Sequence, residues 1–128
     1  MKWTIKEYHN WIAEGSPINL NVTELDISFS RIKSFSSIRK LHNLTTLDCS
    51  NCKLISLKGI EKLYNLTKLC CSNNKLQSLK RIENLHNLTT LDCAGNELIS
   101  LTGIEKLRNL TELCCLNNQL QFFQIYSN

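Results

Sequence analysis

The chain has 128 residues and a formal net charge of +4, with 42% hydrophobic and 20% charged residues. This composition is ordinary for a globular protein that is long enough to bury one core. One proline and four glycines leave no low-complexity linker, and no apolar run approaches the roughly 18 residues that span a bilayer. The start, MKWTIKEYHNWIAEG, lacks the apolar stretch of a signal peptide. We therefore expect a cytoplasmic protein without membrane contact.

Residues 1–21 predict an N-terminal helical cap. Thr4 and Glu7 have the spacing of a capping box, Gly15 stands where a helix often ends, and Pro17 prevents its continuation. One helical face carries the apolar side chains Ile5, Tyr8, Trp11 and Ile12. We favour packing of this stripe on the next segment over a helix that binds a partner.

From residue 22 onward the sequence repeats every 22 residues without insertion. The copies are 22–43, 44–65, 66–87 and 88–109, followed by a shortened copy at 110–128. Apolar residues recur at copy positions 1, 4, 6, 11, 14, 17 and 20. One copy cannot bury seven such side chains alone, so the copies must stack and share a continuous core.

Each copy divides into a strand and a return segment. Positions 3 to 7 alternate between outward and inward side chains, as in residues 46–50, which is the period of a strand. The later apolar residues come every third position and suit turns or 3₁₀ segments. The predicted fold is an α/β repeat solenoid with about five parallel strands on a concave face, return segments on the convex face and an N-terminal capping helix.

The repeat resembles a known family. Leu88, Leu91, Cys93, Asn96 and Leu98 follow the pattern L-x-x-L-x-L/C-x-x-N/C-x-L of the leucine-rich repeat. The 22-residue spacing is similar to that of internalins and of phosphatase-regulating repeat proteins. GIEKLxNLTxL with cysteine-rich strands also resembles repeat proteins of giant viruses of amoebae, which would place the protein in a host cytoplasm. The resemblance covers 22–128 and implies a solenoid that binds other molecules on its surface.

Position 9 forms an inward column. It contains Ser30, Cys52, Asn74, Asn96 and Asn118. In the family this side chain bonds backbone groups of the adjacent turn, and buried turns need such partners. Cys52 and Ser30 are weaker partners than asparagine, so we expect a less secure ladder near the N-terminal end.

Position 6 forms a cysteine column. It contains Cys49, Cys71, Cys93 and Cys115, after Ile27 in the first copy. A straight line of thiols cannot surround one ion tetrahedrally, so we favour core packing over a metal site and expect no cofactor. Cys70 and Cys114 occupy the outward position 5 two copies apart, about 9.6 Å, which is too far for a disulfide.

Asn-Leu-Thr recurs at Asn43, Asn65, Asn87 and Asn109. The tripeptide is a glycosylation sequon, but its fixed spacing follows the repeat. A glycan on every copy would crowd one edge of the stack. We therefore interpret the asparagines as structural.

The C-terminal end allows two interpretations. Its last apolar residues are Phe122, Phe123, Ile125 and Tyr126. They fold over the final core layer, or they leave an apolar patch beside an open strand edge at 112–116 that favours a weak homodimer.

The outward strand positions define the candidate binding face. Its residues are Glu24, Asp26, Thr46, Asp48, Lys68, Cys70, Thr90, Asp92, Glu112 and Cys114. Five acidic groups against one lysine give this face a formal charge of −4. An acidic groove repels nucleic acid, so the predicted partner is a basic or polar peptide or loop of a protein.

We predict no enzymatic activity, because the sequence lacks a phosphate loop, a zinc-protease motif and a nucleophile elbow. The predicted function is a non-catalytic interaction module or adaptor. The alternatives are a structural or particle-associated protein without a specific ligand, and a protein that self-associates through its C-terminal end.

Overall fold

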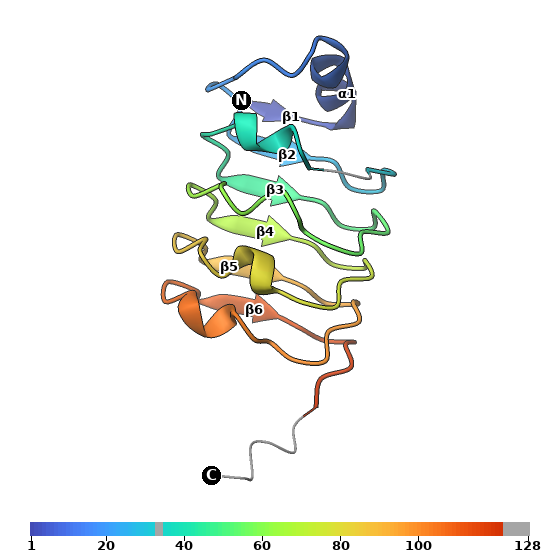
Figure 1. Cartoon of the computed structure of the whole chain (residues 1–128), viewed down its shortest axis with the longest axis vertical. Coiled ribbons are helices and arrows are strands. Elements are labelled where there is room, and N and C mark those ends of the chain that lie inside the picture. The colour runs from blue at the N-terminus through green and yellow to red at the C-terminus, as the bar shows by residue number, and fades with distance from the viewer. Residues whose placement is uncertain (33–34, 122–128) are drawn as a thin grey trace.

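The computed structural model describes residues 1–32 and 35–121. One helix, α1 (Ile5–Ala13), lies near the N-terminus. The strands are β1 (Lys2–Trp3), β2 (Glu24–Asp26), β3 (Thr46–Asp48), β4 (Lys68–Cys70), β5 (Thr90–Asp92) and β6 (Glu112–Cys114). Short 3₁₀ helices follow at η1 (Ile38–Lys40), η2 (Lys80–Ile82) and η3 (Ile104–Lys106). The strands form one sheet in chain order, as Figure 1 shows.

All neighbouring strands are parallel and in register. Leu47 pairs with Leu25 on one side and with Leu69 on the other, and Leu91 follows Leu69. Each 22-residue copy thus forms one coil that advances by one strand. The predicted repeat solenoid with return segments is confirmed, and β1 adds a sixth strand that the repeat pattern does not contain.

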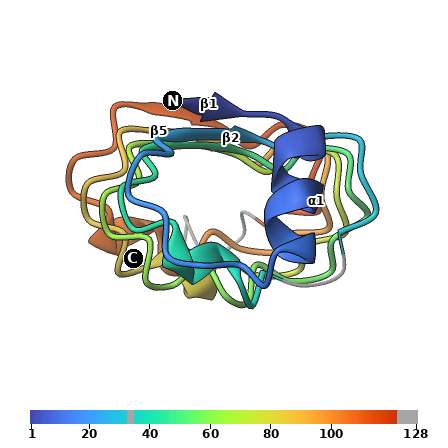
Figure 2. The same ribbon diagram turned by 90° about the horizontal axis from the view of Figure 1, so that it is seen from above.

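The core lies inside a flattened ring. Figure 2 shows the sheet along one long side of the ring and the 3₁₀ turns along the other. The leucine columns at positions 1 and 4 are buried, as Leu44, Leu66 and Leu88 illustrate, each with no exposed surface. These columns touch across adjacent coils, which is why no coil is stable by itself.

The N-terminal segment packs on the first coil as a strand and a helix. Glu7 accepts a hydrogen bond from the backbone N–H of Thr4 at 3.1 Å, and the predicted capping box is present. Tyr8 and Trp11 are buried, and the Trp11 indole N–H donates to the carbonyl of Pro17 at 2.8 Å. Ile12, which the sequence places in the packed apolar stripe, is instead 39% exposed.

Apolar side chains of the last described coil are exposed, because no part of residues 1–32 and 35–121 covers them. Leu113 on β6 is 42% exposed, and Leu116 is 70% exposed, whereas the equivalent Leu91 is 1% exposed. The sequence allowed the last apolar residues either to close this end or to leave an apolar patch, and these residues, Phe122, Phe123, Ile125 and Tyr126, lie outside the described ones.

No described helix has the length and apolar character needed to cross a membrane.

Candidate binding face

The strand face is the side of the sheet turned away from the core, and its side chains form two rows. The first row contains Lys2, Glu24, Thr46, Lys68, Thr90 and Glu112, one from each strand. The second row contains Asp26, Asp48, Cys70, Asp92 and Cys114. The register therefore brings all ten predicted face residues together and adds Lys2.

Negative charge is concentrated in the second row, which we call the acidic row. Lys2 and Lys68 balance the two glutamates of the first row, whereas three aspartates of the acidic row have no lysine between them. The face thus carries −3 where the sequence predicts −4. Lys2 was missed because it belongs to no repeat, and only its lysine-tryptophan alternation before the helix hints at a strand.

Serines at the strand ends fix two of these aspartates. Asp26 Oδ1 accepts hydrogen bonds from the Ser28 N–H at 3.0 Å and the Ser28 hydroxyl at 2.6 Å. Ser50 donates to Asp48 Oδ1 in the same way, at 3.0 and 2.7 Å. The Ser28 bonds lower the pKa of Asp26, and the charge of Lys2 lowers it further. The carboxylates are therefore held in place and Asp26 is ionised near neutral pH.

The serines two residues after the aspartates and Cys70 are less exposed than the strand alternation predicts. Ser50 and Ser72 stand at the outward position 7, but they are only 7% and 9% exposed. The chain turns directly after each strand, as the left-handed φ of 55° at Asn51 shows. The hydroxyl of Ser50 therefore faces Asp48, and the strand face ends at the acidic row.

The two outward cysteines are separate thiols. Cys70 and Cys114 are free and half-buried, and β5 with Asp92 lies between them. Cys70 Sγ is 3.5 Å from the Ser72 hydroxyl and 3.9 Å from Asp92 Oδ2. Within the described residues, no three histidine, cysteine or acidic side chains group as a metal site.

The inward cysteine column is part of the core. Cys49, Cys71 and Cys93 are fully buried, and Cys115 in the last coil is half-buried. Burial raises the pKa of Cys49 and Cys71 well above the ordinary thiol value and that of Cys93 to about 12. These side chains are neutral thiols that pack as small apolar groups.

The asparagine column joins the coils behind the strand ends. Asn74 Oδ1 accepts from the backbone N–H groups of Cys52 and Leu54 at 2.9 and 3.0 Å. Its amide nitrogen lies 3.0 Å from the carbonyl oxygens of both Cys49 and Cys71. Asn96 and Asn118 make the same carbonyl contacts one and two coils later, and each Oδ1 accepts one backbone N–H, from Leu76 and Leu98 respectively.

Cys52 and Ser30 make fewer bonds at this position. The thiol of Cys52 donates to the carbonyl of Ile27 at 3.2 Å or to that of Ser50 at 3.3 Å. The Ser30 hydroxyl donates to the same Ile27 carbonyl at 2.6 Å. Neither side chain accepts a backbone N–H among the described residues, so the first two coils lack the amide bridge of the later ones.

The sequon asparagines form another ladder at the opposite end of the strands. Each side-chain nitrogen donates to a carbonyl of the preceding coil, as Asn65 does to His42 at 3.0 Å and Asn87 does to Tyr64 at 2.8 Å. Neighbouring hydroxyls do the same, with Thr67 bonded to the Thr45 carbonyl at 3.1 Å. A glycan needs this nitrogen, so the geometry favours the structural interpretation.

A parallel sheet with one strand per 22-residue coil, an inward asparagine ladder and 3₁₀ returns defines a leucine-rich repeat solenoid. The chain matches the family described as leucine rich repeats (2 copies) over residues 20–62 and again over 64–106. It belongs to the leucine-rich repeat family.

Solved structures give the same fold. Internalin C2 of Listeria monocytogenes is 28% identical over 77% of this chain and 44% of its own, with a TM-score of 0.74. A leucine-rich repeat protein of Leptospira interrogans is 26% identical over 94% of this chain and 36% of its own, with a TM-score of 0.71. Listerial internalin F is 20% identical with a TM-score of 0.64, over 78% of this chain and 36% of its own.

This chain therefore spans less than half the length of each of these proteins. A search of the curated proteins found no match. The resemblance to giant-virus repeat proteins stays a prediction.

Proposed function

We propose that this chain is a non-catalytic interaction module whose acidic row holds a basic peptide or loop of a protein partner. Leucine-rich repeat domains are in general protein–protein interaction modules, and the extended strand face of a solenoid is a common binding surface. The observation that carries the proposal is the set of anchored aspartates Asp26, Asp48 and Asp92 in one row without a basic neighbour in that row.

The hydrogen bonds leave Oδ2 of Asp26 and of Asp48 for a ligand, whereas Asp92 Oδ2 has one long contact, 3.9 Å, from the Cys70 thiol. Asp26 and Asp48 use Oδ1 for their serines, and Asp92 Oδ1 accepts the Ala94 N–H at 3.1 Å. Asp26 and Asp48 lie on adjacent strands, about 4.8 Å apart along the sheet. One arginine fork can therefore reach the Oδ2 atoms of both residues.

The spacing along the row suggests a sequence for the ligand. From the midpoint of Asp26 and Asp48 to Asp92 is two and a half strand spacings, about 12 Å. Four residues of an extended peptide span about 13 Å and bring side chains back to the same side. A ligand with two arginines four residues apart would match the row.

The size of the face favours a peptide over a globular partner. Six strands of two or three residues each offer roughly 300 Å², whereas a stable protein complex usually buries about 800 Å² on each partner. A short segment or a loop fits within the strand face alone.

The electrostatics of the face argue against acid–base catalysis. A general acid or base works best with a pKa near the operating pH. The pKa of Asp26 is instead lowered, because Ser28 and Lys2 stabilise its charged form. A half-buried, ionised carboxylate of this kind suits charge recognition.

The test is fluorescence anisotropy with the labelled peptide Gly-Arg-Thr-Ser-Thr-Arg-Gly. Asp48→Asn with Asp92→Asn removes two charges but keeps Oδ1 as an acceptor, and Glu24→Gln with Glu112→Gln is the matched control on the same face. We expect the aspartate pair to weaken binding about tenfold and the glutamate pair less than about threefold. Equal weakening by both pairs, or equal binding of a peptide with glutamine for arginine, would reject the proposal.

Exposure at the last coil supports self-association as a second candidate. Leu113 and Leu116 are 42% and 70% exposed beside the edge strand β6, and unpaired edges attract further strands. Leu116→Lys should then abolish a concentration-dependent dimer in analytical ultracentrifugation. A monomer at every concentration tested would exclude this candidate.

A further inference from the structure

A groove opens on the surface between the first two coils, away from the strand face. It has a volume of about 950 Å³ and runs from the turn after β2 to the return segment of the second coil. This volume lies in the usual range for ligand sites, roughly 300–1,000 Å³. No strand-face residue lines it.

A difference in coil-to-coil bonding accounts for the position of the groove. In later coils the Lys75 N–H donates to the Leu54 carbonyl at 2.7 Å, and the Leu54 N–H donates to Asn74. Within the described residues, neither bond has a counterpart between the first two coils, where Ile32 and Lys53 hold the equivalent positions. Cys52 stands where an asparagine would accept the Ile32 N–H, so the two coils are less tightly joined here.

The rim of the groove is strongly basic. Among the described residues its cations are Arg31, Arg39, Lys53, Lys58 and Lys62, all of them exposed. The described residues contain two ion pairs, Arg81–Glu61 and Lys106–Glu83, and neither uses one of these five cations. Their charge is therefore available to a ligand.

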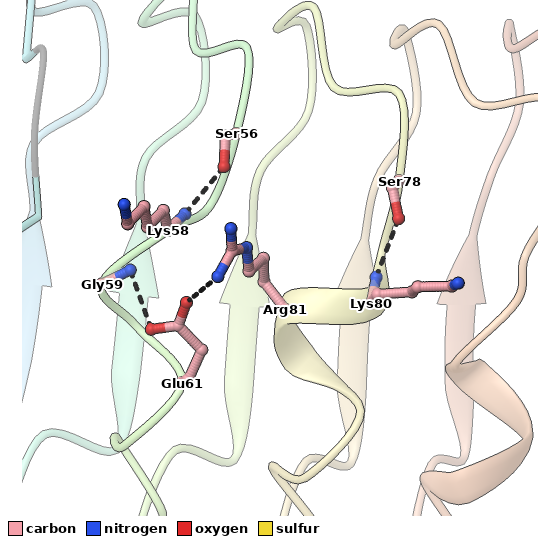
Figure 3. A network of polar contacts seen from close by, with 7 residues as sticks. All are labelled: Ser56, Lys58, Gly59, Glu61, Ser78, Lys80 and Arg81. Atoms are coloured by element: carbon pink, nitrogen blue, oxygen red, sulfur yellow. Dashed lines mark hydrogen bonds and ion pairs between the residues drawn. The ribbon is translucent and has the colours of Figure 1, made fainter.

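Glu61, the carboxylate that lines the groove, already has hydrogen-bond partners. Glu61 accepts the Gly59 N–H at 2.8 Å and the Arg81 guanidinium N–H at 3.0 Å, and Figure 3 shows Arg81 reaching it from the next coil. Figure 3 also shows Lys58, whose backbone N–H is bonded to Ser56 at 3.0 Å while its side chain extends away from that bond. Glu61 thus does not neutralise the five rim cations.

The floor of the groove is apolar. Leu54 and Phe35 are nearly buried, Ile32 is half-buried, and Ile55 is 76% exposed. A ligand that fills the groove would place apolar groups on the accessible Ile32 and Ile55 and negative groups on the rim. Nucleic acid fits less well, because its bases stack on exposed aromatic rings and Phe35 is only 1% exposed.

We propose that this basic groove between the first two coils binds an acidic peptide segment that carries both carboxylates and large apolar side chains. The groove is a second surface of opposite charge to the acidic row. The two sites can therefore hold unlike partners on one small solenoid. The proposal does not depend on the function of the strand face.

The first test measures binding of the labelled peptide Glu-Leu-Glu-Glu-Leu-Glu by fluorescence anisotropy. Lys53→Glu with Lys58→Glu reverses two rim charges, and Lys75→Glu with Lys80→Glu makes the same change at the same repeat positions one coil later, outside the groove. We expect the groove pair to weaken binding about tenfold more than the control pair. Equal effects of the two pairs would overturn the proposal.

The second test closes the groove without changing its charge. Cys52→Asn supplies the amide that bridges the later coils, so we expect tighter joining of the first two coils, a higher unfolding midpoint and at least about fivefold weaker binding of the acidic peptide. A stabilised variant that binds the peptide with unchanged affinity would overturn the proposal. Preferential binding of a thymidine oligonucleotide or of phosphatidylserine vesicles by the unmodified protein would do so as well.

Discussion

Replacement of Asn74 by alanine should destabilise the solenoid more than any single change on its surface. The side chain is 7% exposed and bridges two coils. Its removal leaves the backbone N–H groups of Cys52 and Leu54 without their acceptor. Each unsatisfied buried group costs about 1–3 kcal/mol, so we expect a loss of about 3–5 kcal/mol in the free energy of unfolding. That is a large share of the roughly 5–15 kcal/mol that a domain has.

Urea denaturation followed by circular dichroism measures this loss. Cys52→Ala is the internal comparison, because the Cys52 thiol contacts the carbonyls of Ile27 and Ser50 and the Ser30 hydroxyl but accepts no backbone N–H in the described chain. We expect it to cost about 1 kcal/mol. If Asn74→Ala and Cys52→Ala lowered stability equally, the amide ladder would not be the bond that joins the coils.

Three further predictions concern the turns, the buried cysteines and the strand face. Gly59→Ala should cost about 3 kcal/mol in thermal unfolding, because φ at Gly59 is +109° and the new Cβ would lie 2.8 Å from Phe35 Cβ. Gly15→Ala is the control and should cost about 1 kcal/mol, because no atom lies within 4 Å of its new Cβ. Equal costs of the two changes would contradict the close approach at Gly59. In native protein at pH 8, Ellman's reagent should label Cys70 and Cys114 before Cys49 and Cys71, whose pKa values burial raises; early labelling of Cys49, located by mass spectrometry, would contradict the buried column. The pKa of Asp26 is lowered in the folded state, so its contribution to the stability of the fold is present above the ordinary pKa of 3.8 and is lost as the pH falls through the folded pKa. Asp26→Asn should therefore make stability less sensitive to pH below about 4. An unchanged acid transition of this variant would contradict the prediction.

The sequence predicts the strand register because each coil repeats the same apolar positions. A one-residue slip of a strand would turn a buried leucine such as Leu47 toward solvent, so the period alone determines which residues pair. The ten candidate face residues follow from the same alternation. Repetition is therefore what made the fold and the rows of side chains predictable.

The features that the sequence did not reveal depend on departures from the repeat. Lys2 joins the strand face through β1, which belongs to no copy. Ser50 has the outward parity of a strand, but the chain turns at Ser50 and Asn51, and the Ser50 side chain is buried against Asp48. The basic groove depends on the absence of a bridge at Cys52, which lies across the coil boundary from Ile32. Such features require distances between coils, which a repeat pattern does not contain.

A two-dimensional NMR titration of ¹⁵N-labelled protein with the peptide Gly-Arg-Thr-Ser-Thr-Arg-Gly tests the central claim most directly, because it reports the binding site residue by residue. We expect amide shifts along residues 24–28, 46–50 and 90–94, and none at Ile55 or Lys58 in the basic groove. Shifts confined to the groove or to the last coil, or no shifts at millimolar peptide, would contradict recognition of basic ligands by the acidic row.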